Sequence, residues 1–135
     1  MRFMLIVKAT DKSEAGILPT EKELAEMAKF NEEMIKNGVM LAGDGLQPSR
    51  KGARVTFKSG KPTVVDGPFT EVKELIGGFW LIQAKSKQEA IEWARRVPFV
   101  DGQIEVRQVF ELEDFGQSEA TELHAKHREH LSKRS

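Results

Sequence analysis

Short apolar runs separated by polar turns make up most of the chain, a pattern typical of β-strands, and two segments change to helical spacing. The first run, residues 3–7, is apolar at every position, so both faces of the strand that it predicts are apolar. Further strands are predicted over residues 39–42, 53–57, 63–65, 79–84 and 103–110. The Ser-Gly-Lys-Pro turn at residues 59–62 joins two of these strands into a hairpin.

Both helices are marked by a capping pattern at their start. Thr20 and Glu23 have the spacing of a capping box, in which hydroxyl and carboxylate each accept a backbone N–H, and apolar residues at helical spacing follow. The pattern predicts a helix over residues 21–37. Ser86 and Glu89 repeat it and predict a second helix.

The order of elements is strand, helix, strand, hairpin, strand, helix, strand. It predicts an α+β fold, a ferredoxin-like α/β sandwich with an inserted β-hairpin. No linker divides the chain, so we expect one domain over residues 1–117 and a C-terminal helical tail over 118–135. The tail has few apolar positions, which leaves open a weakly docked helix and a frayed end.

The strand over residues 79–84 needs apolar cover on both sides, whereas two helices cover only one face of a sheet. A second copy of the chain, packed sheet against sheet, is the simplest cover for the other face. We therefore expect a homodimer.

Charge and composition exclude several classes of function. Lysine plus arginine and aspartate plus glutamate each number 21, so the net charge is zero, which argues against a dedicated binder of nucleic acid or of a membrane surface. The chain has no cysteine, which excludes disulfides, thiolate metal sites and a cysteine nucleophile. No run approaches the ~20 apolar residues of a membrane span. These features predict a cytoplasmic protein.

Asp66 is the leading candidate for chemistry. An aspartate in a turn usually accepts a hydrogen bond from the N–H two residues on, but that residue is Pro68, which has no N–H. Capping of the Phe69 N–H is the structural alternative. As a hypothesis, Asp66 lies at the mouth of a pocket between sheet and helices, where partial burial raises its pKa and suits it to general acid or base catalysis.

Asp44, between Gly43 and Gly45, is the second candidate, either at a ligand or as a turn residue that ends a strand. If Asp44 and Asp66 share a cleft, they form a carboxylate pair with separated pKa values. Gly77-Gly78 either brings the backbone close to a ligand or marks a bulge. Three polar residues near Asp66 are candidates for binding an anionic substrate, or are ordinary surface residues: Arg54, Thr70 and Lys73.

All three histidines lie in the tail at three-residue spacing: His124, His127 and His130. On a helix, neighbouring pairs share a face, so a transition-metal site is conceivable, although a solvated helix face is the more ordinary interpretation. We expect no metal and no cofactor.

Three segments carry a resemblance to a known family: residues 41–48 (LAGDGLQP), 65–79 (VDGPFTEVKELIGGF) and 110–116 (FELEDFG). They resemble the YCII-related family, in particular the branch named after its Asp-Gly-Pro-Phe motif, and the resemblance runs from about Arg2 to Phe115. It implies a dimeric α/β barrel and a catalytic or ligand-binding carboxylate at Asp66. The family usually has glutamate at position 44 and Ala-Glu-Thr at 70–72. Some members are thought to use a histidine–aspartate pair, whereas residues 1–117 contain no histidine.

Two functions remain open. The first is a small-molecule-binding protein that acts as a metal-free, lyase-like or isomerase-like enzyme, with Asp66 transferring a proton. The alternative is a non-catalytic ligand-binding or regulatory module, linked to an extracytoplasmic-function sigma factor as the resemblance implies.

Overall fold

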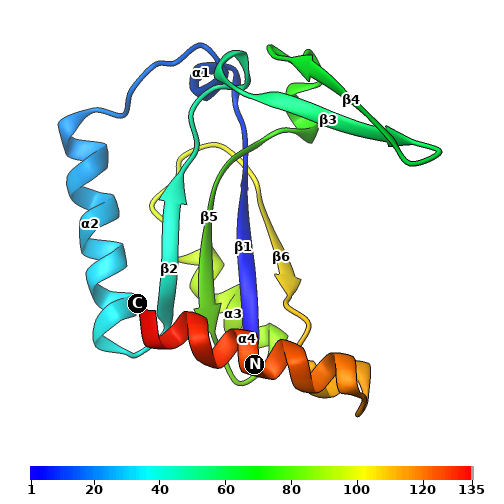
Figure 1. Ribbon diagram of the computed structural model, residues 1–135. Coiled ribbons are helices and arrows are strands. Elements are labelled where there is room, and N and C mark those ends of the chain that lie inside the picture. Colours follow the sequence, from blue (N-terminus) through cyan, green and yellow to red (C-terminus); the bar gives the residue numbers. More distant parts are fainter. Residues whose placement is uncertain (135) are drawn as a thin grey trace.

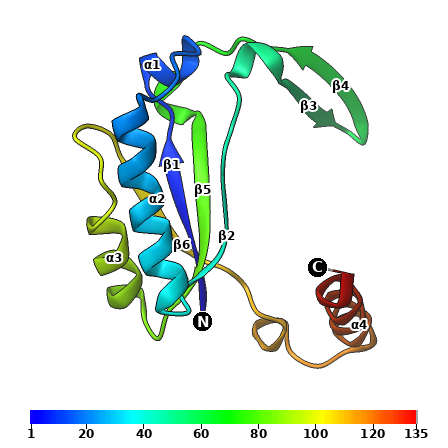
Figure 2. The same cartoon turned by 90° about the vertical axis from the view of Figure 1, so that its left-hand side faces the viewer.

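The computed structural model describes residues 1–134, with side chains described through residue 132. Four strands form an antiparallel sheet in the order β2-β5-β1-β6: β1 (Arg2–Lys8), β2 (Met40–Gly45), β5 (Ile76–Gln83) and β6 (Ile104–Gln108). The helices α2 (Glu21–Lys36) and α3 (Lys87–Arg95) cover one face (Figures 1 and 2). This topology is that of a ferredoxin-like sandwich, as the sequence predicted.

The inserted hairpin is a separate two-stranded sheet of β3 (Ala53–Lys58) and β4 (Lys61–Asp66). It lies beyond one end of the main sheet and extends to the side away from α2 and α3 (Figure 2). The tail forms α4 (Glu119–Arg134), a helix on that same side at the opposite end of the sheet. The described residues also form three 3₁₀ turns: η1 (Ser49–Lys51), η2 (Val72–Glu74) and η3 (Leu112–Phe115).

The core lies between the sheet and the two helices. Phe3 and Leu5 of β1 and Ile82 of β5 are fully buried there. The helices contribute Phe30, Met34, Ala90 and Trp93, and Trp80 of β5 packs among them. Alternate residues of the strands point to the core because the side-chain period of a strand is two residues.

The predicted caps are confirmed. Thr20 Oγ1 accepts the Glu23 N–H at 3.1 Å, and the Glu23 carboxylate accepts the Thr20 N–H at 3.2 Å. Ser86 Oγ accepts the Glu89 N–H at 3.1 Å, while the Glu89 side chain bonds the N–H of Lys85 rather than that of Ser86. The two helices therefore begin where the sequence predicted.

Two local expectations are wrong. Residues 11–14, for which the sequence predicted neither helix nor strand, form the short helix α1 (Asp11–Glu14), whose start is capped by Thr10. The fourth strand runs from Lys61 to Asp66 rather than over 63–65, so Asp66 is a strand residue and not a turn residue. A proline at position 62 is tolerated because the hairpin offers edge positions that need no backbone donor.

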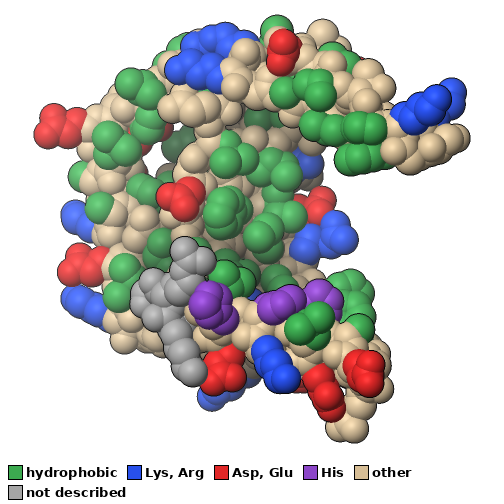
Figure 3. All heavy atoms as spheres, in the orientation of Figure 1, with side chains coloured by type: hydrophobic (Ala, Val, Ile, Leu, Met, Phe, Trp, Pro, Cys, Tyr) green, Lys and Arg blue, Asp and Glu red, His purple; other side chains and the backbone are tan. Residues whose placement is uncertain are grey.

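The face of the sheet away from the helices remains open. Met4, Ile6, Phe79 and Leu81 are half-buried on it. Figure 3 shows hydrophobic side chains over this face between the hairpin and α4. Of the helices that the structure describes, none has the length and apolar character needed to cross a bilayer.

Candidate functional site

A cavity of about 410 Å³ lies between α2 and the sheet, near the end of β2. Its apolar and aromatic walls come from Val7, Leu24, Met27, Trp80 and Phe99, and the lining also includes Phe79, whose side chain lies on the open face of the sheet. Four glycines also line it, Gly43 and Gly45 of β2 and Gly77 and Gly78 of β5. We call this space the glycine-lined cavity; Asn31 and Asp44 complete its lining.

Of the four glycines, Gly45 is the one whose missing side chain leaves open space, since a Cβ on Gly43, Gly77 or Gly78 would meet another atom within 3.4 Å. A Cβ on Gly43 would lie 2.7 Å from Trp80 Cδ1, whereas a Cβ on Gly45 would have no atom within 4 Å. Opposite Gly78, the pairing of β1 with β5 shifts by one residue between Val7 and Lys8. The bulge expected at Gly77-Gly78 is thus observed, and both glycines line the cavity, whereas close approach of their backbone to a ligand stays a prediction.

Trp80 is fixed in place by two neighbours. Its Nε1–H donates to Asn31 Oδ1 at 2.9 Å, and its ring packs edge-on against Phe30 with centroids 5.6 Å apart. The Asn31 amide nitrogen makes no hydrogen bond with the described residues, so its two N–H groups are available beside the cavity.

Among the described residues that line this cavity, Asp44 is the one ionisable residue. It pairs with Phe79 across the β2–β5 ladder, whereas Gly43 pairs with Trp80. Paired residues of an antiparallel ladder point to the same face, so the Asp44 side chain projects to the open face and Gly43 faces α2. Asp44 therefore lies at the edge of the cavity, on the edge strand of the sheet, and is exposed.

The structure places Asp66 elsewhere than expected. It is exposed at the end of β4, opposite Ala53 in the hairpin, and lines neither this cavity nor the groove described below. The expected position at the mouth of a pocket between sheet and helices is therefore wrong for the single chain, because the hairpin projects away from the helices. The structure does not bring Asp44 and Asp66 into one cavity. A chemical role for Asp66 stays a prediction.

Capping of Phe69 by Asp66 is also not observed. The Phe69 N–H donates instead to Ser49 Oγ at 3.0 Å. The Ser49 N–H and hydroxyl donate in turn to the Glu14 carboxylate, at 2.9 and 2.5 Å. Donation from the Ser49 hydroxyl, and then from its N–H, holds the pKa of Glu14 below its ordinary value.

This set of contacts, which we call the Ser49 junction, fixes the base of the hairpin. Gly67 packs directly on it, since a Cβ at that position would lie 1.8 Å from the Ser49 carbonyl oxygen. The Gly67 N–H donates to Gly52 O at 3.0 Å, and the Gly67–Pro68 peptide is cis. The Asp-Gly-Pro-Phe segment thus connects the hairpin to η1 and α1. Sequence reasoning missed Glu14 and Ser49, and no local pattern marks either of them.

The other predicted binding residues also lie outside the cavity. The Arg54 guanidinium stacks over the Phe69 ring, 3.8 Å from its centroid. Thr70 and Lys73 are exposed in the segment between β4 and β5. A role for these three residues in substrate binding stays a prediction.

The tail histidines lie on α4, where the His124 and His127 rings pack edge to face at 6.1 Å. Within the described part of the chain, no three histidine, aspartate or glutamate side chains are grouped to hold a metal ion. The helix is tied to the domain by Glu111, whose carboxylate pairs with Arg2 at 2.8 Å and with Arg128 at 3.3 Å. The Arg2 hydrogen bond keeps the pKa of Glu111 below its usual value.

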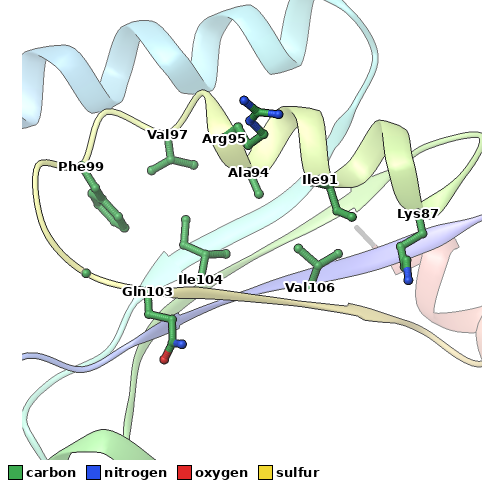
Figure 4. A pocket seen from close by; sticks show the side chains of 10 residues that line it. Lys87, Ile91, Ala94, Arg95, Val97, Phe99, Gln103, Ile104 and Val106 are labelled. Carbon is green, nitrogen blue, oxygen red and sulfur yellow. The ribbon is translucent and has the colours of Figure 1, made fainter.

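A second space, which we call the outer groove, lies between α3 and β6 (Figure 4). It has a volume of about 570 Å³, and its walls include Ile91, Ala94, Ile104 and Val106. The Lys87 side chain lies at one end of the groove and the Phe99 ring at the other (Figure 4).

The fold and the cavity define a small ferredoxin-like protein with a partly open cavity of the size of a small molecule. Residues 1–113 match the YCII-related domain, and the chain belongs to this family.

Two comparisons add detail. The chain is 31% identical over 75 residues to the uncharacterized protein R00369 of Rhizobium meliloti (strain 1021), a match of 56% of this chain that spans 60% of the relative's length. The structure of 5-chloro-2-hydroxyhydroquinone dehydrochlorinase (TftG) from Burkholderia phenoliruptrix AC1100, in complex with 2,5-dihydroxybenzoquinone, is similar over 82% of this chain and 95% of that one. The sequence identity is 16% and the TM-score 0.42.

Proposed function

We propose that the chain binds a compact small molecule with an apolar ring in the glycine-lined cavity. The observation that carries the proposal is the cavity itself, about 410 Å³ of space between α2 and the sheet. Ligand pockets typically measure about 300–1,000 Å³ and combine apolar walls with a few polar groups. We also place the chain in the Asp-Gly-Pro-Phe branch of its family, because residues 66–69 carry that motif.

The lining supports a particular class of ligand. Trp80 and Phe99 offer aromatic surface, and Leu24 and Met27 of α2 offer aliphatic surface, which suits a planar ring. The available Asn31 amide group suits a carbonyl or hydroxyl oxygen on that ring. A ligand of this class buries apolar surface and satisfies a polar group that otherwise has no partner among the described residues.

Proton transfer is the second candidate function. Asp44 is the one ionisable residue in the described lining of the cavity, and it lies at the cavity's edge with its carboxylate on the open face of the sheet. A carboxylate in this position can act as a general base, as in lyase or isomerase chemistry, only on a ligand that extends past the edge strand to the open face. Binding alone and binding followed by proton transfer differ only in what Asp44 does.

A thermal-shift screen of small ring compounds tests the proposal. A ligand at 100 times its dissociation constant stabilises the folded state by about 2.7 kcal/mol. With about 2.1 cal/mol/K of unfolding entropy per residue over 135 residues, the melting temperature rises by roughly 9 °C. A Gly45→Leu variant fills the cavity and should remove the shift, whereas Thr56→Leu on the exposed hairpin should keep it.

Equal shifts for both variants would overturn the proposed site. Asp44→Asn then separates the two functions. If the wild type turns the ligand over and Asp44→Asn binds it without turnover, proton transfer is assigned to Asp44. If both proteins bind the ligand and the wild type shows no turnover, the function is binding alone.

We also propose that a second copy of the chain covers the open face of the sheet, giving the dimeric α/β barrel. The half-buried apolar residues of β1 and β5 support this, as does the zero net charge, which leaves no overall repulsion between copies. Covering about 500 Å² of apolar sheet contributes about 12 kcal/mol before the costs of association. The link to a sigma factor stays a prediction.

A further inference from the structure

We infer that Phe99 sets the size of the ligand, because its ring forms the partition between the glycine-lined cavity and the outer groove. The inference rests on the proposed function and names a residue that determines its specificity. Phe99 is the one described residue that lines both spaces.

The floors of the two spaces are continuous. Val7 of β1 lines the cavity and Ile104 of β6 lines the groove, and these two residues are direct partners in the β1–β6 ladder. Partners in a ladder have Cα atoms about 4.5–5.5 Å apart. The sheet therefore runs without a break beneath both spaces, and only what lies above it separates them.

The Phe99 ring supplies that separation. It packs against Trp80 with ring centroids 6.5 Å apart and planes tilted by 44°. Figure 4 shows the ring at the end of the groove, with Ile104 beside it and the apolar side chains of α3 leading away toward Lys87. The Trp80 ring in turn is fixed by Asn31, so the partition rests on a rigid neighbour.

The loop that carries Phe99 is fixed at both ends and exposed between them. Val97 is buried in the core, and Gln103 O accepts the Lys8 N–H at 3.0 Å. Between these anchors, Val100 is 98% exposed and Gly102 has a φ of +131°. Truncation of Phe99 therefore removes the partition and leaves the anchors of the loop in place.

Without the ring, the cavity of about 410 Å³ opens into the groove of about 570 Å³, which more than doubles the available space. The wild-type chain should thus select compact rings and reject long apolar substituents. A chain with a small residue at position 99 should accept an elongated apolar ligand that runs along α3.

A series of phenols with para-alkyl chains of increasing length, from methyl to nonyl, tests this inference. Each probe is titrated into the wild type, Phe99→Ala and Phe57→Ala, with tryptophan fluorescence as the readout because Trp80 lines the cavity. Phe57 is a matched control, since it is 70% exposed on the hairpin and lines neither space.

Affinity for the wild type and for Phe57→Ala should rise about fourfold for each methylene and then level off where the chain meets Phe99. For Phe99→Ala the rise should continue to longer chains. If affinity levels off at the same chain length in all three proteins, or never levels off in the wild type, the inference about Phe99 is overturned and the proposed function stands. If no phenol binds the wild type, the proposed function fails together with it.

Discussion

Two neighbouring glycines of β2 allow a sharp test of how the cavity is built. Gly43 and Gly45 both face α2 and both line the cavity. A methyl group at Gly43 would lie 2.7 Å from Trp80 Cδ1 and 2.9 Å from Met40 Cε, whereas at Gly45 it would meet nothing within 4 Å. The same change, glycine to alanine, should therefore have opposite effects two residues apart.

The magnitude follows from how Trp80 is held. Carbon atoms in contact are normally about 3.5–4.0 Å apart, so relief of the Gly43→Ala contact requires the Trp80 ring to move by about 1 Å. That movement strains the hydrogen bond of 2.9 Å to Asn31 and the edge-on packing against Phe30. Overpacking of this kind destabilises a core by about 1–3 kcal/mol. At about 3.5 °C for each kcal/mol, Gly43→Ala should lower the melting temperature by roughly 7 °C.

Gly45→Ala serves as the matched control. Its methyl group enters open space, and the loss of glycine's freedom in the unfolded chain stabilises a protein by about 0.4–1 kcal/mol where the backbone is compatible. Urea denaturation followed by tryptophan fluorescence measures both variants. If Gly43→Ala is as stable as Gly45→Ala, Trp80 is not fixed as described, and the shape of the cavity has to be reconsidered.

Three further predictions concern other parts of the molecule. Ser49→Ala should destabilise the base of the hairpin by about 1 kcal/mol from the loss of the Phe69 N–H to Ser49 Oγ hydrogen bond alone. Hydrogen exchange in β3 and β4 should become faster, while exchange in β1 stays unchanged. Because the pKa of Glu14 is lowered in the folded state, its ionised form contributes stability above its ordinary pKa of 4.5 and loses it as the pH falls through the lowered value. Glu14→Gln should therefore lose less stability than the wild type between about pH 6 and pH 3, and parallel pH curves for the two proteins would contradict this. Leu81→Lys, on the open face, should convert a dimer to a monomer in light scattering, and a monomeric wild type in dilute solution would refute the proposed assembly.

Features set by neighbours in the chain could be predicted from the sequence. The Thr20 cap, the ends of the helices and the two apolar faces of β5 depend on residues within a few positions of one another. The ferredoxin-like topology could be inferred from the order of the elements, because few topologies connect them without crossing.

The candidate site was predicted in part, and the difference has a physical cause. Pro68 denies Asp66 its usual hydrogen-bond partner, but the local sequence does not indicate which group accepts the Phe69 N–H. That group is Ser49, which lies 20 residues away, and its own partner Glu14 is 35 residues further from it. Contacts at such separations depend on how the hairpin packs, and no periodicity in the sequence reports them.

Asp44 illustrates the opposite case. Its two flanking glycines indicated close approach of the backbone to a ligand, and the structure places all three residues at the cavity. What the glycine pattern could not show was the alternation of faces, which directs the Asp44 carboxylate away from α2.

The Ser49 junction also bears on how this hairpin could be exchanged between relatives. The strands β3 and β4 end on contacts that three separate stretches of chain provide, through Glu14, Ser49 and the segment from Gly67 to Phe69. If the strands alone were transplanted, the hairpin would come from one protein and the residues that contact its base from another. These contacts would then not match. The hairpin is a transferable module only when α1 and η1 travel with it, so a functional chimera requires all three stretches from the same parent.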